Sequence, residues 1–312
     1  MDRSTALLGR ALNGTALIAP RLAGRAAFEL FRHPVRRSRV RSTEREVHDR
    51  ARPSALTVGG SPVTVYRWGD GTRPVLLVHG WRSRASRFAG FVPRLLDLGL
   101  SPVAFDAPGH GDSGGRATTI LEYREIIARL HARHGPFEAV VAHSFGVSAA
   151  FLALREGVPA GRLVAVSGVA EFRFLVDGFR QQLGLADRLE RELTRRIERV
   201  LFPAEEALWE RFDATHRPAE ITPRILVVHD QDDDVVPIGQ AHRLKAAYGD
   251  RLDLLTTRGL GHRRILTEPG VLDNVLGFLA EPSPGRSQVL PASASAAAPH
   301  RLPSGPPGLP TA

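Results

Sequence analysis

The chain has 312 residues, of which 43% are hydrophobic and 24% charged, as expected of a globular protein with one large α/β domain or two small ones. Because it contains no cysteine, disulfide scaffolds, thiolate metal sites and cysteine nucleophiles are excluded. The net charge of +9 comes mainly from residues 1–52, whereas residues 53–280 carry 28 basic and 27 acidic side chains and do not predict a nucleic-acid partner.

Residues 1–52 are predicted to form a basic, apolar, helical segment. Between residues 16 and 37, apolar side chains are interspersed with five arginines. This stretch is either a helix packed on the main domain or an interfacial helix on anionic lipid, and both interpretations stay open. A secretory signal is disfavoured because Arg21 and Arg25 interrupt any apolar core. With no run of about 18 apolar residues to span a bilayer, we expect a cytoplasmic protein, peripheral to the membrane if residues 16–37 bind lipid.

Residues 53–280 alternate short β-rich runs with helical patterns. The predicted strands are Val63–Tyr66, Val75–Val78, Val103–Phe105, Ala139–Ala142, Leu163–Val166, Ile225–Val228 and Leu252–Leu255. The later runs are continuously apolar, which is typical of strands buried on both faces of a parallel sheet. A helix is predicted at Ile120–His134, where Thr119 and Glu122 form a capping box. This alternation predicts a doubly wound, mostly parallel α/β sheet.

The interval 171–222 contains helical spacing but no strand signal. One stripe consists of Leu189, Leu193, Ile197 and Leu201, and Pro203 is expected to open a further helix toward Phe212. Such an insertion between two strands predicts a cap over the ligand-binding edge of the sheet. The apolar side chains expected to line the pocket are Phe172, Phe174, Leu175, Phe179, Leu183 and Trp209. This lining favours a substrate with an apolar part.

Residues 281–312 form a tail of different composition. Twenty-two of these residues are Pro, Ala, Ser or Gly. A segment of this kind cannot bury enough apolar surface to offset the entropy lost on ordering, so it is predicted to be disordered.

A serine stands where a predicted strand meets a predicted helix. The sequence Ala142-His-Ser144-Phe-Gly146 follows the strand and opens the helix Phe145–Arg155. An acyl-transfer serine must project from a tight turn, so its neighbours two positions away must be small. The pattern resembles the nucleophile elbow of the α/β-hydrolase superfamily, with Ala142 where glycine is commonest. The resemblance implies the α/β-hydrolase fold, with Ser144 as the nucleophile.

The same resemblance implies two backbone donors for an oxyanion hole. The strand that ends in Val-His79-Gly80-Trp81 resembles the family's strand followed by His-Gly, whose next N–H group maps onto Trp81. The second donor is the N–H group of Phe145, at the start of the helix. The loop Phe105–Ser113 also resembles a loop of the family, and we assign it no catalytic task.

The acid and the histidine of a triad are expected after the serine in chain order. The sequence Asp-Gln-Asp-Asp-Asp-Val-Val-Pro resembles the family's acid-bearing loop and, aligned on its Val-Val-Pro end, places the acid at Asp233. Asp232 and Asp234 are rivals for this role. The sequence Gly-Leu-Gly-His resembles the family's C-terminal Gly-His loop, which makes His262 the base.

Three other patterns do not predict a metal or a nucleotide. The aspartate cluster lacks the glycine and the distal glutamate of a calcium loop. The segment Gly109–Gly114 matches Gly-x-Gly-x-x-Gly, but two strands precede it and no helix opens directly on it, as a dinucleotide turn requires. His131 and His134 have no apparent third ligand. We therefore expect no metal and no cofactor.

The resemblance covers residues 56–280 and implies a serine hydrolase. It would cleave a carboxylic ester or thioester of a small acyl substrate through an acyl-enzyme on Ser144. A serine at this position argues against the branch of the fold that uses an aspartate nucleophile. Two alternatives stay open: a non-catalytic ligand-binding protein of the same fold, and a peptidase, carbon–carbon bond hydrolase or perhydrolase. The cap selects among the last three, and the triad does not.

Overall fold

The computed structural model describes residues 3–34 and 36–281, which belong to one compact unit that ends at Glu281. The tail predicted to be disordered lies outside the described residues, apart from Glu281. Glu281 is held against the compact unit by an ion pair between its carboxylate and Arg224 at 2.6 Å.

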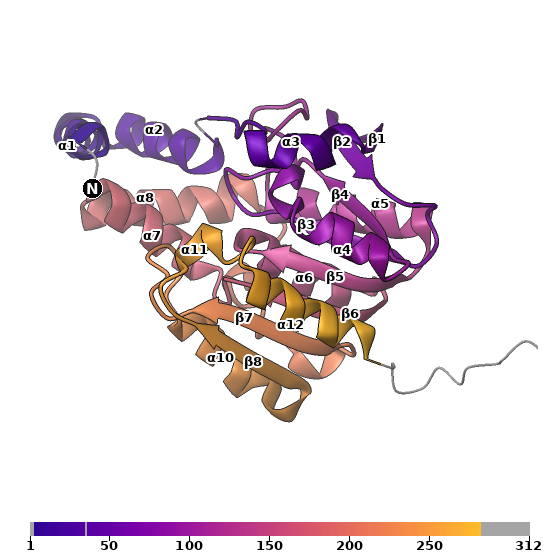
Figure 1. Ribbon diagram of the computed structural model, residues 1–312. Coiled ribbons are helices and arrows are strands. Elements are labelled where there is room, and N and C mark those ends of the chain that lie inside the picture. Colours follow the sequence, from indigo (N-terminus) through magenta and orange to yellow (C-terminus); the bar gives the residue numbers. More distant parts are fainter. Residues whose placement is uncertain (1–2, 35, 282–312) are drawn as a thin grey trace, which may run out of the picture. The chain divides into compact units, whose positions relative to one another are not determined.

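An eight-stranded sheet forms the centre of the molecule (Figure 1). In chain order its strands are β1 (Arg52–Val58), β2 (Ser61–Arg67), β3 (Pro74–Val78), β4 (Ser101–Phe105), β5 (Phe137–His143), β6 (Ala160–Val166), β7 (Arg224–Asp230) and β8 (Leu252–Thr257). Their order across the sheet is β1-β2-β4-β3-β5-β6-β7-β8. The β1–β2 and β2–β4 pairs are antiparallel and the other pairs parallel. The predicted fold class is therefore confirmed.

Helices cover both faces of this sheet. One face packs against α5 (Ile120–His134), α6 (Phe145–Arg155) and α10 (Gly239–Tyr248), and the other packs against α4 (Phe91–Asp97) and α12 (Pro269–Ala280). The helix α5 begins and ends at the predicted residues. Its capping box is present, because Thr119 accepts from the Glu122 N–H group and Glu122 accepts from the Thr119 N–H group.

The interval between β6 and β7 is helical, as its spacing predicts. It contains α7 (Arg173–Leu183), α8 (Asp187–Arg196), a π-helical turn η2 (Ile197–Leu201), the short α9 (Leu208–Arg211) and the turn η3 (Pro218–Glu220). The predicted helix from Pro203 to Phe212 is wrong, since only the single turn α9 forms. A left-handed residue, Ala207, precedes α9, and Phe202 and Phe212 bend back to pack edge to face at 4.9 Å.

Two N-terminal helices, α1 (Arg3–Ile18) and α2 (Pro20–Arg32), form a hairpin that packs on α7 and α8. Glycines allow the close approach. A Cβ on Gly9 would lie 1.7 Å from the carbonyl oxygen of Leu183, and one on Gly24 would lie 2.0 Å from Cγ of Glu192. The Asn13 amide exchanges hydrogen bonds of 2.8 and 2.9 Å with the backbone between α7 and α8. One face of the hairpin is thus held by the cap.

Residues 33–41 link the hairpin to α3 (Ser42–Asp49) across the loop that follows β4. The Arg37 guanidinium donates to the carbonyl groups of Gly111, Ser113 and Gly115 in that loop. In α3, the buried Glu44 pairs with Arg87. No helix in the described ranges 3–34 and 36–281 has the length and apolar character needed to cross a membrane.

Candidate active site

Ser144 occupies a tight turn between β5 and α6. Its φ of 57° and ψ of −126° lie outside the ordinary helical and strand regions. Two glycines make room for this turn: a Cβ on Gly146 would lie 2.6 Å from the Val78 carbonyl oxygen, and one on Gly80 would lie 2.6 Å from Ser144 Cβ. The backbone is strained at one residue whose side chain is presented at the strand end, as an acyl-transfer serine requires.

The structure brings Ser144, His262 and Asp233 together from three separate loops. His262, in the short helix α11 (Gly261–Arg264) after β8, has its Nε2 atom 3.0 Å from Ser144 Oγ. Its Nδ1 atom lies 2.8 Å from Asp233 Oδ2. With a neutral imidazole, Ser144 donates to Nε2 and the Nδ1–H group donates to Asp233. This is the geometry of a nucleophile, a base and a carboxylate that orients the base.

The geometry separates Asp233 from its two rivals. Besides facing His262, Asp233 accepts the N–H groups of Val235 and Val236 through Oδ1 at 2.9 and 2.8 Å. Burial raises the pKa of this carboxyl, but the hydrogen bonds from His262 and from these N–H groups outweigh burial and hold the pKa below its ordinary value. Asp232 instead accepts the Gly259 N–H group at 2.9 Å, and Asp234 is exposed.

Asp230 has a position that the sequence analysis did not assign. It is fully buried at the end of β7, and its Oδ2 atom accepts the Thr257 hydroxyl at 2.7 Å and the Leu260 N–H group at 3.0 Å. Asp230 therefore ties the acid-bearing loop to the loop that carries His262. The available signal was a carboxylate at the end of a continuously apolar run, where only a specific partner justifies its burial.

The two backbone groups expected to form an oxyanion hole flank Ser144. Gly80 lies against the serine, so the next N–H group, that of Trp81, is close to it. Phe145 is the first residue of α6, whose N-terminal N–H groups have no partner inside the helix. Among the described residues, neither the Trp81 nor the Phe145 N–H group makes a hydrogen bond with another backbone group. The side chains of Trp81 and Phe145 meet edge to face, with ring centroids 6.1 Å apart.

Three buried histidines support this site in the neutral form. Burial lowers the pKa of His79 to about 4, and that of His110 and His143 to about 3. His79 donates from Nδ1 to the Gly80 carbonyl at 2.7 Å and accepts the Ala107 N–H group at Nε2. His143 donates from Nε2 to the carbonyl oxygen of His262 at 2.9 Å. These imidazoles fix the backbone on both sides of Ser144.

Acid is expected to destabilise the fold through these three imidazoles. The unfolded chain binds a proton at each below its ordinary pKa of about 6.5, whereas the folded chain stays neutral down to about pH 4. When the pH falls from about 7 to about 5, each histidine is therefore expected to lower the free energy of unfolding by about 2 kcal/mol. Burial raises the pKa of Asp213 to about 6, so the folded chain binds a proton there more readily than the unfolded chain does. This carboxyl therefore offsets about 1 kcal/mol of the loss in the free energy of unfolding. The free energy of unfolding, measured with urea, should fall by about 5 kcal/mol.

A matched pair of variants tests this origin. His110→Gln should reduce the loss between the two pH values by about 2 kcal/mol, because one of the three protonation sites disappears. His242→Gln removes an exposed histidine and should leave the loss unchanged. A free energy of unfolding that is equal at both pH values in the unmodified protein would contradict the prediction.

The loop after β4 has a structural role around Asp106. This buried carboxylate accepts the N–H groups of Ala85 and Asp112 at 2.8 and 2.9 Å and the Tyr66 hydroxyl at 3.0 Å. A Cβ on Gly111 would lie 1.9 Å from its Oδ2 atom. Of the glycines in the Gly-x-Gly-x-x-Gly match, Gly111 thus lies against a side chain of the protein, and the next helix begins only at Ile120.

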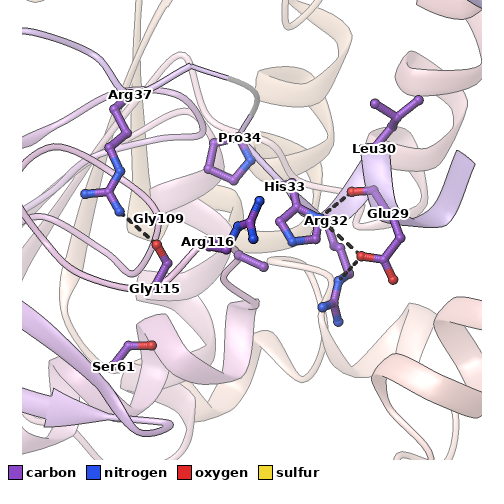
Figure 2. A pocket seen from close by; sticks show the side chains of 11 residues that line it. Glu29, Leu30, Arg32, His33, Pro34, Arg37, Ser61, Gly109, Gly115 and Arg116 are labelled. Carbon is purple, nitrogen blue, oxygen red and sulfur yellow. Dashed lines mark hydrogen bonds and ion pairs between the residues drawn. The ribbon is translucent and has the colours of Figure 1, made fainter. Parts of the chain in front are cut away.

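A cavity of about 1010 Å³, whose lining side chains are drawn in Figure 2, is lined by none of the three residues of the candidate triad. It is lined by residues of α2 and of the following link, and by the β4 loop; its charged lining residues are Glu29, Arg32, Arg37 and Arg116. Glu29 pairs with Arg32 at 3.1 Å, and Arg37 is bound to backbone carbonyl groups. Because Ser144 and His262 do not line it, this cavity is not the expected acyl pocket.

Three of the side chains expected to line the pocket contact other parts of the molecule. Phe179 meets Phe31 of α2 edge to face at 5.4 Å. Leu183 packs in the cluster beneath the N-terminal hairpin, because the end of α7 faces α1. Phe172 is buried in the core of the cap itself, with the ring centroids of Phe202 and Phe212 at 6.2 and 5.0 Å from its own.

Within the described ranges 3–34 and 36–281, no group of three or more metal-ligating side chains is placed to hold a metal ion.

The fold and the geometry of the site can be compared with known proteins. A model of the alpha/beta hydrolase family matches residues 75–275, more than half of the chain. The chain belongs to the alpha/beta hydrolase family. Ser144, Asp233 and His262 all fall within the matched residues. The superfamily expected from the sequence motifs is therefore confirmed.

Solved structures with the same fold include several hydrolases. A monoacylglycerol lipase from Paleococcus ferrophilus is 20% identical, with 70% of this chain and 98% of that chain covered and a TM-score of 0.55. A thioesterase domain from the curacin biosynthetic pathway is 16% identical, with 73% of this chain and 99% of that chain covered and a TM-score of 0.53. A membrane phospholipase A described as a bacterial virulence factor is 18% identical, with 88% of this chain and 96% of that chain covered and a TM-score of 0.56. No protein with a curated description matches the chain. Family and fold together support a hydrolase.

Proposed function

We propose that this protein is a serine hydrolase that cleaves a carboxylic ester or thioester. The observation that carries the proposal is the continuous chain of hydrogen bonds from Ser144 through His262 to Asp233, at 3.0 and 2.8 Å. A surface serine at a strand–helix junction needs neither a buried imidazole nor a buried carboxylate behind it. A nucleophile that must lose its proton during attack needs both.

In the proposed reaction, Ser144 Oγ attacks the carbonyl carbon while His262 Nε2 takes its proton. The charge on the carbonyl oxygen is held by the N–H groups of Trp81 and Phe145, which act where negative charge develops. His262 then returns the proton to the leaving alcohol or thiol, and the acyl group stays on Ser144. Water, deprotonated by the same imidazole, releases the carboxylic acid. Asp233 orients the imidazole and stabilises its cation.

The cap favours an acyl group with an apolar part. Phe174, Leu175 and Trp209 are half-buried in the cap, and apolar side chains of the cap share one hydrophobic cluster with Phe145. Pockets for small ligands are lined mostly by such side chains, with few polar groups. The lipase, phospholipase and thioesterase among the solved structures offer precedent for acyl substrates on this fold. Their low identity transfers no substrate to this chain.

A substrate series tests the proposal. The purified protein is assayed with p-nitrophenyl esters of increasing acyl length and with the matching coenzyme A thioesters. We expect turnover, with kcat/KM rising from acetyl to longer acyl chains. The reason is that each methylene buried in an apolar pocket adds about 0.8 kcal/mol to the favourable free energy of binding. The ratio of ester to thioester turnover then identifies the leaving group.

Two outcomes would favour the alternatives. No turnover together with covalent labelling by a fluorophosphonate probe would indicate another acyl chemistry, such as peptide hydrolysis. Neither turnover nor labelling would favour a non-catalytic protein that binds a ligand on this fold.

A further inference from the structure

The N-terminal hairpin leaves large apolar side chains exposed. Of the eight large apolar side chains that are exposed in the described part of the chain, five lie on α1 and α2: Leu7, Leu8, Leu17, Ile18 and Leu22. We name these five the hairpin edge. Four of them are the most exposed of the eight, with 91% of Ile18, 79% of Leu17, 64% of Leu7 and 62% of Leu22 accessible. Single exposed apolar residues need no explanation, but a cluster on one motif indicates an interaction site.

The exposure follows from how the hairpin is held. In α1, Gly9, Leu12 and Ala16 recur at helical spacing and are buried against the cap. Leu7 and Ile18 recur on the opposite side of the same helix and point away from it. Figure 1 shows α1 and α2 at one end of the molecule, alongside α8. The cap therefore covers one side of the hairpin, and no described residue covers the other.

The charged side chains that the hairpin carries between residues 3 and 28 are all arginines. Arg10, Arg21 and Arg25 are exposed beside it, and none of them pairs with a carboxylate among the described residues. Residues 3–28 contain no aspartate or glutamate. Apolar side chains next to arginines, without acidic residues, are typical of helices that lie in the interface of an anionic bilayer. A second copy docked through the same surface would bring this positive charge against itself.

We propose that the hairpin edge docks on an anionic lipid bilayer. The apolar side chains enter the boundary between headgroups and acyl chains, while the three arginines meet lipid phosphates. Since α1 and α2 are fixed to α7 and α8, docking brings the cap to the bilayer. There the cap would meet the apolar acyl substrates, which partition into lipid. This last consequence rests on the proposed function, but the docking itself does not.

The experiment measures partitioning of the full-length protein into sedimenting vesicles. The vesicles are phosphatidylcholine alone or phosphatidylcholine with phosphatidylglycerol, each at low and high salt. We expect binding to the anionic vesicles that weakens with salt. Leu17→Ser combined with Ile18→Ser should weaken this binding by at least about tenfold. The reason is that the free energy gained by burying either side chain in lipid exceeds the free energy that corresponds to a tenfold change in affinity. Ser144→Ala should bind like the unmodified protein, which separates this test from catalysis.

Charge is tested in a second pair of variants. Arg21→Gln combined with Arg25→Gln should weaken binding to anionic vesicles by about fivefold for each arginine, and leave binding to phosphatidylcholine unchanged. Arg45→Gln combined with Arg133→Gln removes the same charge from exposed positions elsewhere and should have no comparable effect. Leu96→Ser is the matched apolar control, because this side chain is exposed in α4, outside the hairpin and the cap.

Three results would overturn the proposal. The unmodified protein does not bind anionic vesicles; the hairpin-edge variants bind as well as it does; or sedimentation velocity shows a dimer that Leu17→Ser with Ile18→Ser dissociates, which would make a second copy the occupant. Melting temperatures confirm that each variant is folded. Leu22→Ser, tested alone, provides an independent variant of the hairpin edge if the double variant does not fold.

Discussion

Ser144→Ala is expected to abolish covalent labelling by a fluorophosphonate probe and to lower kcat by roughly 10⁶-fold, the scale of nucleophile removal in a serine protease. The reason is that Ser144 Oγ, 3.0 Å from the imidazole of His262, is the only protein atom in the proposed mechanism that bonds to the acyl carbon. Mass spectrometry of the labelled protein locates the adduct. Steady-state kinetics on the best ester of the substrate series measures the loss.

The control for this experiment is a second buried serine of α6. Ser148 donates its hydroxyl to the Val169 carbonyl at 2.8 Å and faces no imidazole. Ser148→Ala should therefore keep both labelling and turnover. If Ser144→Ala is labelled as fast as the unmodified protein, Ser144 is not the nucleophile, and the proposed function fails with it.

Asp233→Asn is expected to lower kcat by about 10⁴-fold with little change in the fold. An asparagine keeps the shape of the side chain, but it can donate to Nδ1 of His262 and so favour the wrong tautomer, and it removes the charge that stabilises the imidazolium. The measurement is kcat on the same ester, with a urea unfolding curve for each variant to separate catalysis from stability.

Two neighbouring aspartates serve as matched controls. Asp232 holds the Gly259 N–H group and Asp234 is exposed, so Asp232→Asn and Asp234→Asn should each reduce kcat by less than about tenfold. A larger loss from either one than from Asp233→Asn would assign the acid to that neighbour and would mean that the family alignment is displaced by a residue.

Several features could be predicted from local sequence because they depend on residues close together in the chain. The helix α5 begins after Thr119 because the capping box involves only residues 119–122. The turn at Ser144 needs a small residue at 146, which the motif contains. The buried strands of the parallel sheet are continuous apolar runs, as in β7.

The first strand was not predicted, for a physical reason. Residues 52–58 alternate between exposed and partly buried positions and include Pro53, and only Val58 is fully buried. Such an edge strand has little apolar signal of its own. It forms because its backbone pairs with β2, from Arg52 opposite Arg67 to Val58 opposite Ser61. The pairing is a property of two segments, and a pattern in one of them does not reveal it.

The aspartate-rich loop and the N-terminal hairpin show where sequence reasoning ends. The loop was identified by its resemblance to the family's acid-bearing loop, and the hairpin segment by its composition of apolar residues among arginines. Only the tertiary structure decided that Asp233 faces His262 while Asp230 holds Leu260, because these partners lie about 30 residues further along the chain. It also decided which side of the hairpin stays exposed, because the residues that cover the other side belong to α7 and α8, far away in sequence.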